Sequence, residues 1–101
     1  MKDISKRIGI YTIKSIFKNN DDQYVIGCKV RMGFISKKHK IYNINFEEIN
    51  ILDIRRYNSS LKDYEYLSKD SEFGIVLDPS EDIEKYKLNR LLLGEELWNG
   101  Y

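Results

Sequence analysis

The side chains that most often carry catalysis or bind metals are scarce in this sequence. It has one cysteine, Cys28, and one histidine, His39. A nucleophilic thiol–imidazole pair needs the two groups in contact, but Cys28 lies in an apolar stretch and His39 in a basic one. A zinc site needs about four ligands of the cysteine or histidine type. We therefore expect neither a cysteine nucleophile nor a zinc centre.

Other motifs that carry chemistry are incomplete. The sequence has no G-x-x-x-x-G-K-[ST] phosphate-binding loop, which excludes a GTPase or ATPase of that kind. Residues 19–22 read Asn-Asn-Asp-Asp and are of types that bind calcium. They lack the fixed spacing and the distant bidentate glutamate of a calcium loop, which favours a solvated turn. We expect no enzymatic activity, no metal and no cofactor.

The elements that position any site are predicted to be strands. The sequence contains 14 isoleucines, 8 tyrosines and no alanine. Such β-branched and aromatic side chains suit the pleated surface of a sheet better than a helix interior. Apolar alternation between turn residues predicts strands over residues 8–17, 24–31, 34–36, 41–46, 49–56 and 73–78. Closely spaced turns of this kind indicate a small all-β barrel or sandwich.

Turn residues separate these strands. Residues 19–22 form a strong turn signal, and Gly33 is able to adopt the positive φ that a turn after residue 32 needs. Residues 37–40 form a basic corner, and Pro79 ends the last of the six strands.

The last quarter of the chain fits two structures. Ser80, followed by the acidic pair Glu81-Asp82, is suited to cap a helix over residues 81–93. Residues 87–93 fit a final strand equally well. A single helical turn before a last strand satisfies both patterns.

Length and composition bound the class of protein. The chain has 101 residues, which is about one domain, and we place its core at about residues 8–93 with a tail over 94–101. No apolar run approaches the roughly 20 residues of a membrane span. A single cysteine excludes an internal disulfide, so we expect a cytoplasmic protein with no membrane partner.

Charge is divided unevenly along the chain. Residues 1–57 carry 12 basic and 6 acidic side chains, and residues 58–101 carry 5 and 10. This asymmetry can steer a polyanion towards one side of a domain. The overall charge of +1 lacks the basic excess of a dedicated nucleic-acid binder, so a simple dipole is the alternative.

Three segments have an order and spacing that resemble a known family. Phe17 is followed ten residues later by residues 27–35, Gly-Cys-Lys-Val-Arg-Met-Gly-Phe-Ile. Residues 52–57 read Leu-Asp-Ile-Arg-Arg-Tyr, and residues 72–75 read Glu-Phe-Gly-Ile, with Asp-Ile at 82–83. Over about residues 8–90 the sequence is similar to the C-terminal domain of bacterial translation initiation factor 2.

This resemblance implies a fold and a function. The fold is a small closed Greek-key β-barrel, like domain 2 of elongation factor Tu, in which closure removes exposed edge strands. The implied function is non-catalytic binding of an RNA or aminoacyl-tRNA 3′ end, since the family holds the formylmethionine-bearing end of initiator tRNA. The family's binding residues fall on Arg56, Tyr57, Glu72, Phe73 and Gly74.

The residue types at these positions suit an RNA end. Arg56 offers a fork of donors to a phosphate or carbonyl, and Tyr57 offers a flat face for a base, worth about 1–3 kcal/mol. Gly74 lets a ligand approach the backbone, and Glu72 accepts hydrogen bonds from the terminal ribose or amide. Two further positions of the same segments, Cys28 and Arg55, are secondary candidates.

Departures from the family pattern leave alternatives open. Phe73 stands where the family has a cysteine, so its ring either fills the pocket or packs in the core. Arg56 and Glu72 are alternatively a surface ion pair across neighbouring strands. If the tRNA pocket is lost, the barrel is instead a protein-interaction or regulatory module. Such a module contacts its partner through Tyr64 and Tyr66 of a lengthened loop, or through Trp98.

Overall fold

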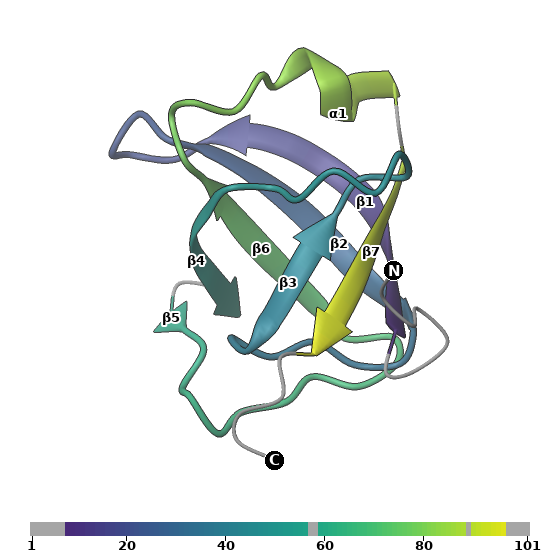
Figure 1. Ribbon diagram of the computed structural model, residues 1–101. Helices are drawn as coiled ribbons and strands as arrows, with labels where there is room; N and C mark the ends of the chain where they lie inside the picture. Colours follow the sequence, from purple (N-terminus) through teal and green to yellow (C-terminus); the bar gives the residue numbers. More distant parts are fainter. Residues whose placement is uncertain (1–7, 57–58, 89, 97–101) are drawn as a thin grey trace.

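The protein folds into one curled antiparallel sheet with a short helix. A computed structural model describes residues 8–56, 59–88 and 90–96. The elements are β1 (Ile8–Lys18), β2 (Tyr24–Met32), β3 (His39–Tyr42), β4 (Ile51–Arg56), β5 (Ser59–Ser60), β6 (Glu72–Leu77), α1 (Glu84–Leu88) and β7 (Leu91–Glu96). The strand order is β3-β7-β1-β2-β6-β4-β5, and the sheet wraps around a single core (Figure 1). The predicted all-β barrel class is confirmed.

The barrel is not closed by a continuous ladder. In the described part of the chain the hydrogen-bonded order begins at β3 and ends at β5, with no ladder from β3 to β4. Instead, the segment before β4 folds back on β3. The Ile49 N–H donates to the Ile41 carbonyl at 2.8 Å, and Tyr42 forms an isolated bridge with Glu48. Isolated backbone contacts therefore hold the segment before β4 against β3 where the ladder stops.

The turn predicted at residues 19–22 joins β1 to β2. The Asn19 side-chain oxygen accepts hydrogen bonds from the backbone N–H groups of Asp21 and Gln23, each at 3.0 Å. Asp22 adopts a φ of 60°, which aspartate tolerates better than most residues. Gly33 has the positive φ expected of it, 74°. Local turn chemistry thus fixes both ends of β2.

A β-bulge in β1 changes which side chains face the core. The register with β2 shifts between Ile13 and Ser15. Tyr11 and Ile13, on one side of the bulge, are buried. Because a bulge adds one residue to one strand, the inward positions move by one, and Phe17 is left 50% exposed on the outside.

The strands predicted over residues 41–46 and 49–56 have different bounds in the structure. The strand expected over residues 41–46 is β3, which begins at His39 within the predicted basic corner and ends at Tyr42. It ends there because the Asn43 side-chain oxygen accepts hydrogen bonds from the N–H groups of Asn45 and Glu47, at 2.9 and 3.1 Å. This local hydrogen bonding competes with the ladder, and Phe46 follows with a φ of 62°.

The segments on either side of β3 also differ from the prediction. Residues 34–36 form only one isolated bridge, between Ile35 and Leu67, rather than a strand. Strand β4 begins at Ile51, not at residue 49, because Ile49 is bonded to β3. Apolar alternation alone did not reveal which neighbour each short run would pair with.

The last quarter combines the two predicted alternatives. Helix α1 is one short turn, and β7 follows it. The cap differs from the expected Ser80, since the Asp82 carboxylate accepts the Glu84 N–H at 3.1 Å. Strand β7 continues to Glu96, so residues 94–96 belong to the sheet rather than to a tail. No helix in the described residues has the length and apolar character to cross a membrane.

One tyrosine fills the barrel beside β7. The Tyr11 ring is fully buried, and its hydroxyl donates to the Phe34 carbonyl at 2.8 Å. Gly9 and Gly94 are paired across β1 and β7, and a Cβ atom added to either would collide with the Tyr11 hydroxyl. The glycine pair thus makes room for the ring.

Candidate functional site

A row of residues across three strands forms a flat patch on the outer face of the barrel. Gly27 of β2 is paired with Gly74 of β6, and Gly74 is paired with Arg55 of β4. Side chains next to Gly74 in sequence, Phe73 and Ile75, point into the core, so Gly74 faces outward. Gly74 has no side chain at the centre of this row, whereas the space over Gly27 is taken by the Ser15 hydroxyl, with which an added Cβ would collide.

A hollow of about 250 Å³ lies over these glycines, and we call it the glycine-floored hollow. It is lined by Phe17, Asn19, Val25, Gly27, Arg55, Glu72, Phe73 and Gly74. Phe17 supplies a half-exposed aromatic ring at its edge. The Glu72 carboxylate is exposed and forms no hydrogen bond or ion pair with any residue that the structure describes. An aromatic ring, an arginine and a carboxylate without a partner among the described residues therefore surround the partly exposed backbone of Gly74.

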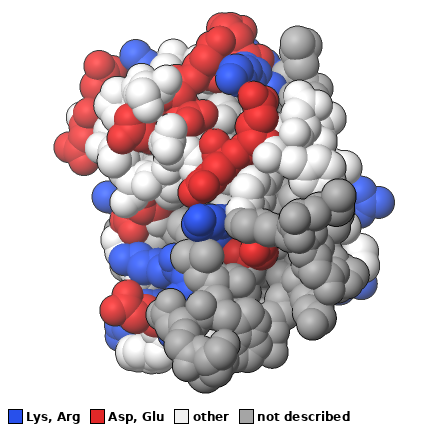
Figure 2. All heavy atoms as spheres, in the orientation of Figure 1, with Lys and Arg blue, Asp and Glu red and all other residues white. Residues whose placement is uncertain are grey.

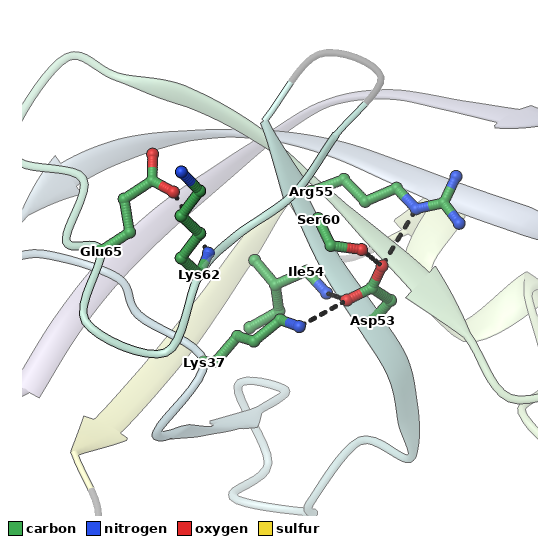
Figure 3. Close-up of polar contacts among 7 residues, drawn as sticks. All are labelled: Lys37, Asp53, Ile54, Arg55, Ser60, Lys62 and Glu65. Carbon is green, nitrogen blue, oxygen red and sulfur yellow. Dashed lines mark hydrogen bonds and ion pairs between the residues drawn. The ribbon is translucent and has the colours of Figure 1, made fainter.

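Arg55 is oriented by a carboxylate two residues earlier. The Arg55 Nε donates to Asp53 Oδ2 at 3.1 Å, and the Asp53 carboxylate also accepts from the Ile54 N–H at 2.9 Å and from the Ser60 hydroxyl (Figure 3). The Lys37 ammonium lies 3.5 Å from the same carboxylate. One partly buried acid therefore joins β4, β5 and the segment before β3.

The charge state of Asp53 follows from these contacts. Partial burial by itself raises the pKa of Asp53, but hydrogen bonds from Ser60 and Arg55 and the charge of Lys37 outweigh it. The pKa of this carboxyl is therefore below its ordinary value, and Asp53 is ionised at neutral pH. Its negative charge fixes the Arg55 side chain while leaving the outer guanidinium donors available.

Arg56 faces a different hollow from Arg55. Its Nη1 lies 3.3 Å from Glu65 Oε2, so the surface pair that we considered between Arg56 and Glu72 is not formed. Arg56 lines a second hollow of about 490 Å³, which we call the Tyr64 hollow. Its lining residues are Arg56, Ser59, Ser60, Lys62, Tyr64 and Glu65.

Phe73 and Cys28 lie in the core. The Phe73 side chain is 4% exposed and packs edge-on against the Tyr11 ring, with 5.2 Å between ring centroids. Phe73 lines the hollow, but its ring is packed in the core and does not plug it. Cys28, its partner in the β2–β6 register, is 2% exposed, and burial raises the pKa of its thiol. As side-chain contacts for a ligand, both residues are excluded by their burial.

The structure describes only some of the aromatic residues that we suggested for protein contact. Tyr64 is 74% exposed, and Tyr66 is 49% exposed with its ring edge-on to Phe34 at 5.3 Å. Tyr57 and Trp98 lie outside the residues that the structure describes.

Three contributors to the site were missed from the sequence. Phe17 was noted only as part of the family resemblance, because the bulge that turns it outward has no sequence signal of its own. Gly27 interrupts a strand, which is a known sign of close backbone approach, but only the register places it beside Gly74. Asp53 could have been found as an acidic residue two positions before an arginine on one strand face.

A larger hollow lies at the seam between β3 and β4. It has a volume of about 650 Å³, and its charged walls are paired with one another: Lys37 with Asp53 at 3.5 Å, and Lys40 with Glu48 at 3.9 Å. Acidic atoms gather over α1 and the segment before β4 in the upper part of Figure 2. No group of three or more metal-ligating side chains occurs within the described residues.

Comparison with known proteins identifies the fold. No family model and no curated protein sequence matches the chain. Among solved structures, it is similar to GDP-bound aIF5B from Aeropyrum pernix, with a TM-score of 0.61 and 17% identity over 90% of this chain. The chain spans 15% of the length of that protein. The chain therefore shares its fold with the matched part of that protein.

Proposed function

We propose that this chain is a non-catalytic, translation-factor-like module that binds the 3′ end of an RNA or of an aminoacyl-tRNA in the glycine-floored hollow. The observation that carries the proposal is the row of Gly27, Gly74 and Arg55, flanked by exposed Phe17 and by the unpaired carboxylate of Glu72. Of the positions that the resemblance to bacterial initiation factor 2 implies, Glu72 and Gly74 line this hollow, whereas Arg56 lines the Tyr64 hollow.

Each group in the hollow suits one part of an RNA end. Phe17 presents a ring on which a terminal base can stack, an interaction worth about 1–3 kcal/mol. The free donors of Arg55, already oriented by Asp53, suit a phosphate. Glu72 can accept hydrogen bonds from ribose hydroxyls or from the amide of an attached amino acid. Gly74 allows a flat ligand to approach the backbone.

Titration of the protein with formylmethionyl-tRNA, followed by backbone NMR, tests this proposal. We expect shifts at Gly27, Arg55, Glu72 and Gly74, with uncharged tRNA revealing whether the amino acid contributes. If no signal moves with protein and tRNA at tens of micromolar, the chain does not bind this ligand.

Substitutions of residues that line the glycine-floored hollow test whether the RNA end binds there. Phe17→Ala is expected to weaken binding roughly tenfold or more, as loss of one stacked base predicts. Gly74→Ala adds a Cβ whose nearest neighbour is Val25 Cγ1 at 3.1 Å, so the fold should tolerate it while the floor rises. The control is Phe46→Asn, which removes an exposed ring outside both hollows and keeps a residue suited to the positive φ. Equal losses in Phe17→Ala and the control contradict the assignment.

A protein-interaction or regulatory module is the second candidate function. Its support is the exposed aromatic surface of Tyr64 and Tyr66, the latter seated against Phe34. A pull-down that compares the wild type with Tyr66→Ala and Trp98→Ala tests it. If neither substitution changes the partners recovered, this surface is not the contact site.

A further inference from the structure

The Tyr64 hollow and the glycine-floored hollow both include a residue from the C-terminal end of β4. Arg55 lines one hollow and Arg56 lines the other, and the two residues are consecutive in the strand. Successive side chains of a strand point to opposite faces, so Arg55 and Arg56 serve different faces of β4. A ligand that occupies both hollows must therefore pass around the end of β4, where Arg56 is the last residue of the strand.

A single carboxylate holds the Tyr64 hollow in shape. Glu65 Oε1 accepts the Lys62 N–H at 3.1 Å, and Glu65 Oε2 lies 3.3 Å from Arg56 Nη1. The Glu65 N–H also donates to the Lys62 carbonyl at 3.0 Å, which closes a turn. Figure 3 shows Glu65 and Lys62 facing each other beside the Asp53 cluster. The turn that carries Tyr64 is therefore fastened to Arg56 at its base.

The hollow combines a flat ring with an excess of positive charge. Tyr64 stands within the turn and is 74% exposed. Arg56 and Lys62 supply two cations against the one carboxylate of Glu65, which is already engaged. The remaining donors of the Arg56 guanidinium and the Lys62 ammonium suit a phosphate, and the ring suits a base. A volume of about 490 Å³ lies within the usual range for a small-molecule site.

We propose that the Tyr64 hollow is a second nucleotide subsite, which binds the base and phosphate of a nucleotide upstream of the 3′ end held in the glycine-floored hollow. This inference rests on the proposed function. It adds that the chain binds a stretch of single-stranded RNA rather than a terminal residue alone, with Phe17 and Tyr64 as the two stacking surfaces. The subsite is tolerant of base identity, because stacking uses the face that every base shares.

Two RNA oligonucleotides, of three and six nucleotides with the same 3′-terminal sequence, test the second subsite. Calorimetry with the full chain is expected to give a hexamer affinity roughly tenfold or more above that of the trimer, as one additional stacked base predicts. Tyr64→Ala should remove this gain and leave the trimer affinity unchanged, whereas Tyr64→Phe should keep it. Tyr66→Ala is the matched control, since Tyr66 is exposed in the same segment but lines neither hollow.

The salt dependence of hexamer binding distinguishes the contribution of the Lys62 charge from that of the Tyr64 ring. Lys62→Gln should reduce the slope of log affinity against log salt for the hexamer by about 0.7, the contribution of one phosphate on a single strand. The slope for the trimer should not change. Equal affinities for trimer and hexamer, or a hexamer gain that survives Tyr64→Ala, overturn the second subsite and leave the first intact. Failure of both oligonucleotides and of tRNA to bind overturns the proposed function as well.

Discussion

At the scale of single residues, the chemistry of the site depends on which groups are left unpaired. Glu72 has no partner among the described residues, whereas Arg55 and Arg56 are each held by a carboxylate, Asp53 and Glu65. A held arginine has lost part of its conformational entropy before a ligand arrives, which lowers the cost of binding. The acids near the arginines thus orient them, and the acid that remains free is the one suited to accept from a ligand.

Asp53→Asn tests the role of that cluster in stability. The Asp53 side chain is 16% exposed and accepts three hydrogen bonds, so loss of its charge should lower the free energy of unfolding by about 1–3 kcal/mol at neutral pH. Urea denaturation measures this difference. The control is Asp63→Asn, an exposed aspartate in the neighbouring turn, which should change stability by less than about 0.5 kcal/mol.

The sign of the pH dependence follows from the lowered pKa of Asp53. A carboxyl whose pKa is lower in the folded state stabilises the fold above its unfolded pKa of about 3.9. That contribution is lost as the pH falls through the folded value. The gap in stability between wild type and Asp53→Asn should therefore be full at neutral pH and shrink in acid; a gap that is constant with pH contradicts this account.

At the scale of elements, the sequence predicted those strands that are long or strongly punctuated. The bounds of β1 and β2 follow from the Asn19 turn and from Gly33, whose conformations are set locally. The short strands around β3 were predicted with wrong bounds. The pairing of so short a run depends on which strand edge lies beside it in the folded protein, and the sequence pattern does not contain this information. Glu72, Gly74 and Arg55 were among the candidate residues predicted from the sequence. Gly27 required the strand register, and Phe17 required knowledge of a bulge that only tertiary pairing creates.

Substitution at the glycine pair beside Tyr11 measures how much stability depends on the space that β1 and β7 leave for the Tyr11 ring. Gly94→Ala places a methyl group into the Tyr11 hydroxyl, and overpacking of this kind should cost about 1–3 kcal/mol of unfolding free energy. Gly74→Ala is the matched control, because it also adds a methyl group to a strand glycine but meets only the tip of Val25. Chemical denaturation of the two variants should give a clearly larger loss for Gly94→Ala. Equal losses would mean that a general effect of strand glycines dominates.

At the scale of the whole molecule, the barrel is held by its core rather than by a closed ladder. The seam between β3 and β4 has only isolated contacts, namely the backbone hydrogen bond from Ile49 to Ile41 and the ion pair of Lys37 with Asp53. Cys28 lies on β2, which is paired on both sides and is distant from the seam in the strand order. The thiol is therefore a probe of whether the barrel opens only locally at the seam or as a unit.

Labelling of Cys28 with a thiol reagent distinguishes these modes of opening. Burial keeps the thiol at 2% exposure and raises its pKa, so the reactive thiolate is suppressed in the folded state. If the barrel opens as a unit, labelling without denaturant should be slowed by about the equilibrium constant for unfolding, on the order of 10³-fold or more, and should accelerate with urea in parallel with it. Because the folded pKa is raised, stability should also fall as the pH rises above the unfolded thiol value of about 8.5. Labelling that is fast and independent of urea would instead mean that β2 and β6 separate locally, which would also disrupt the Gly27–Gly74 floor on which the proposed binding site depends.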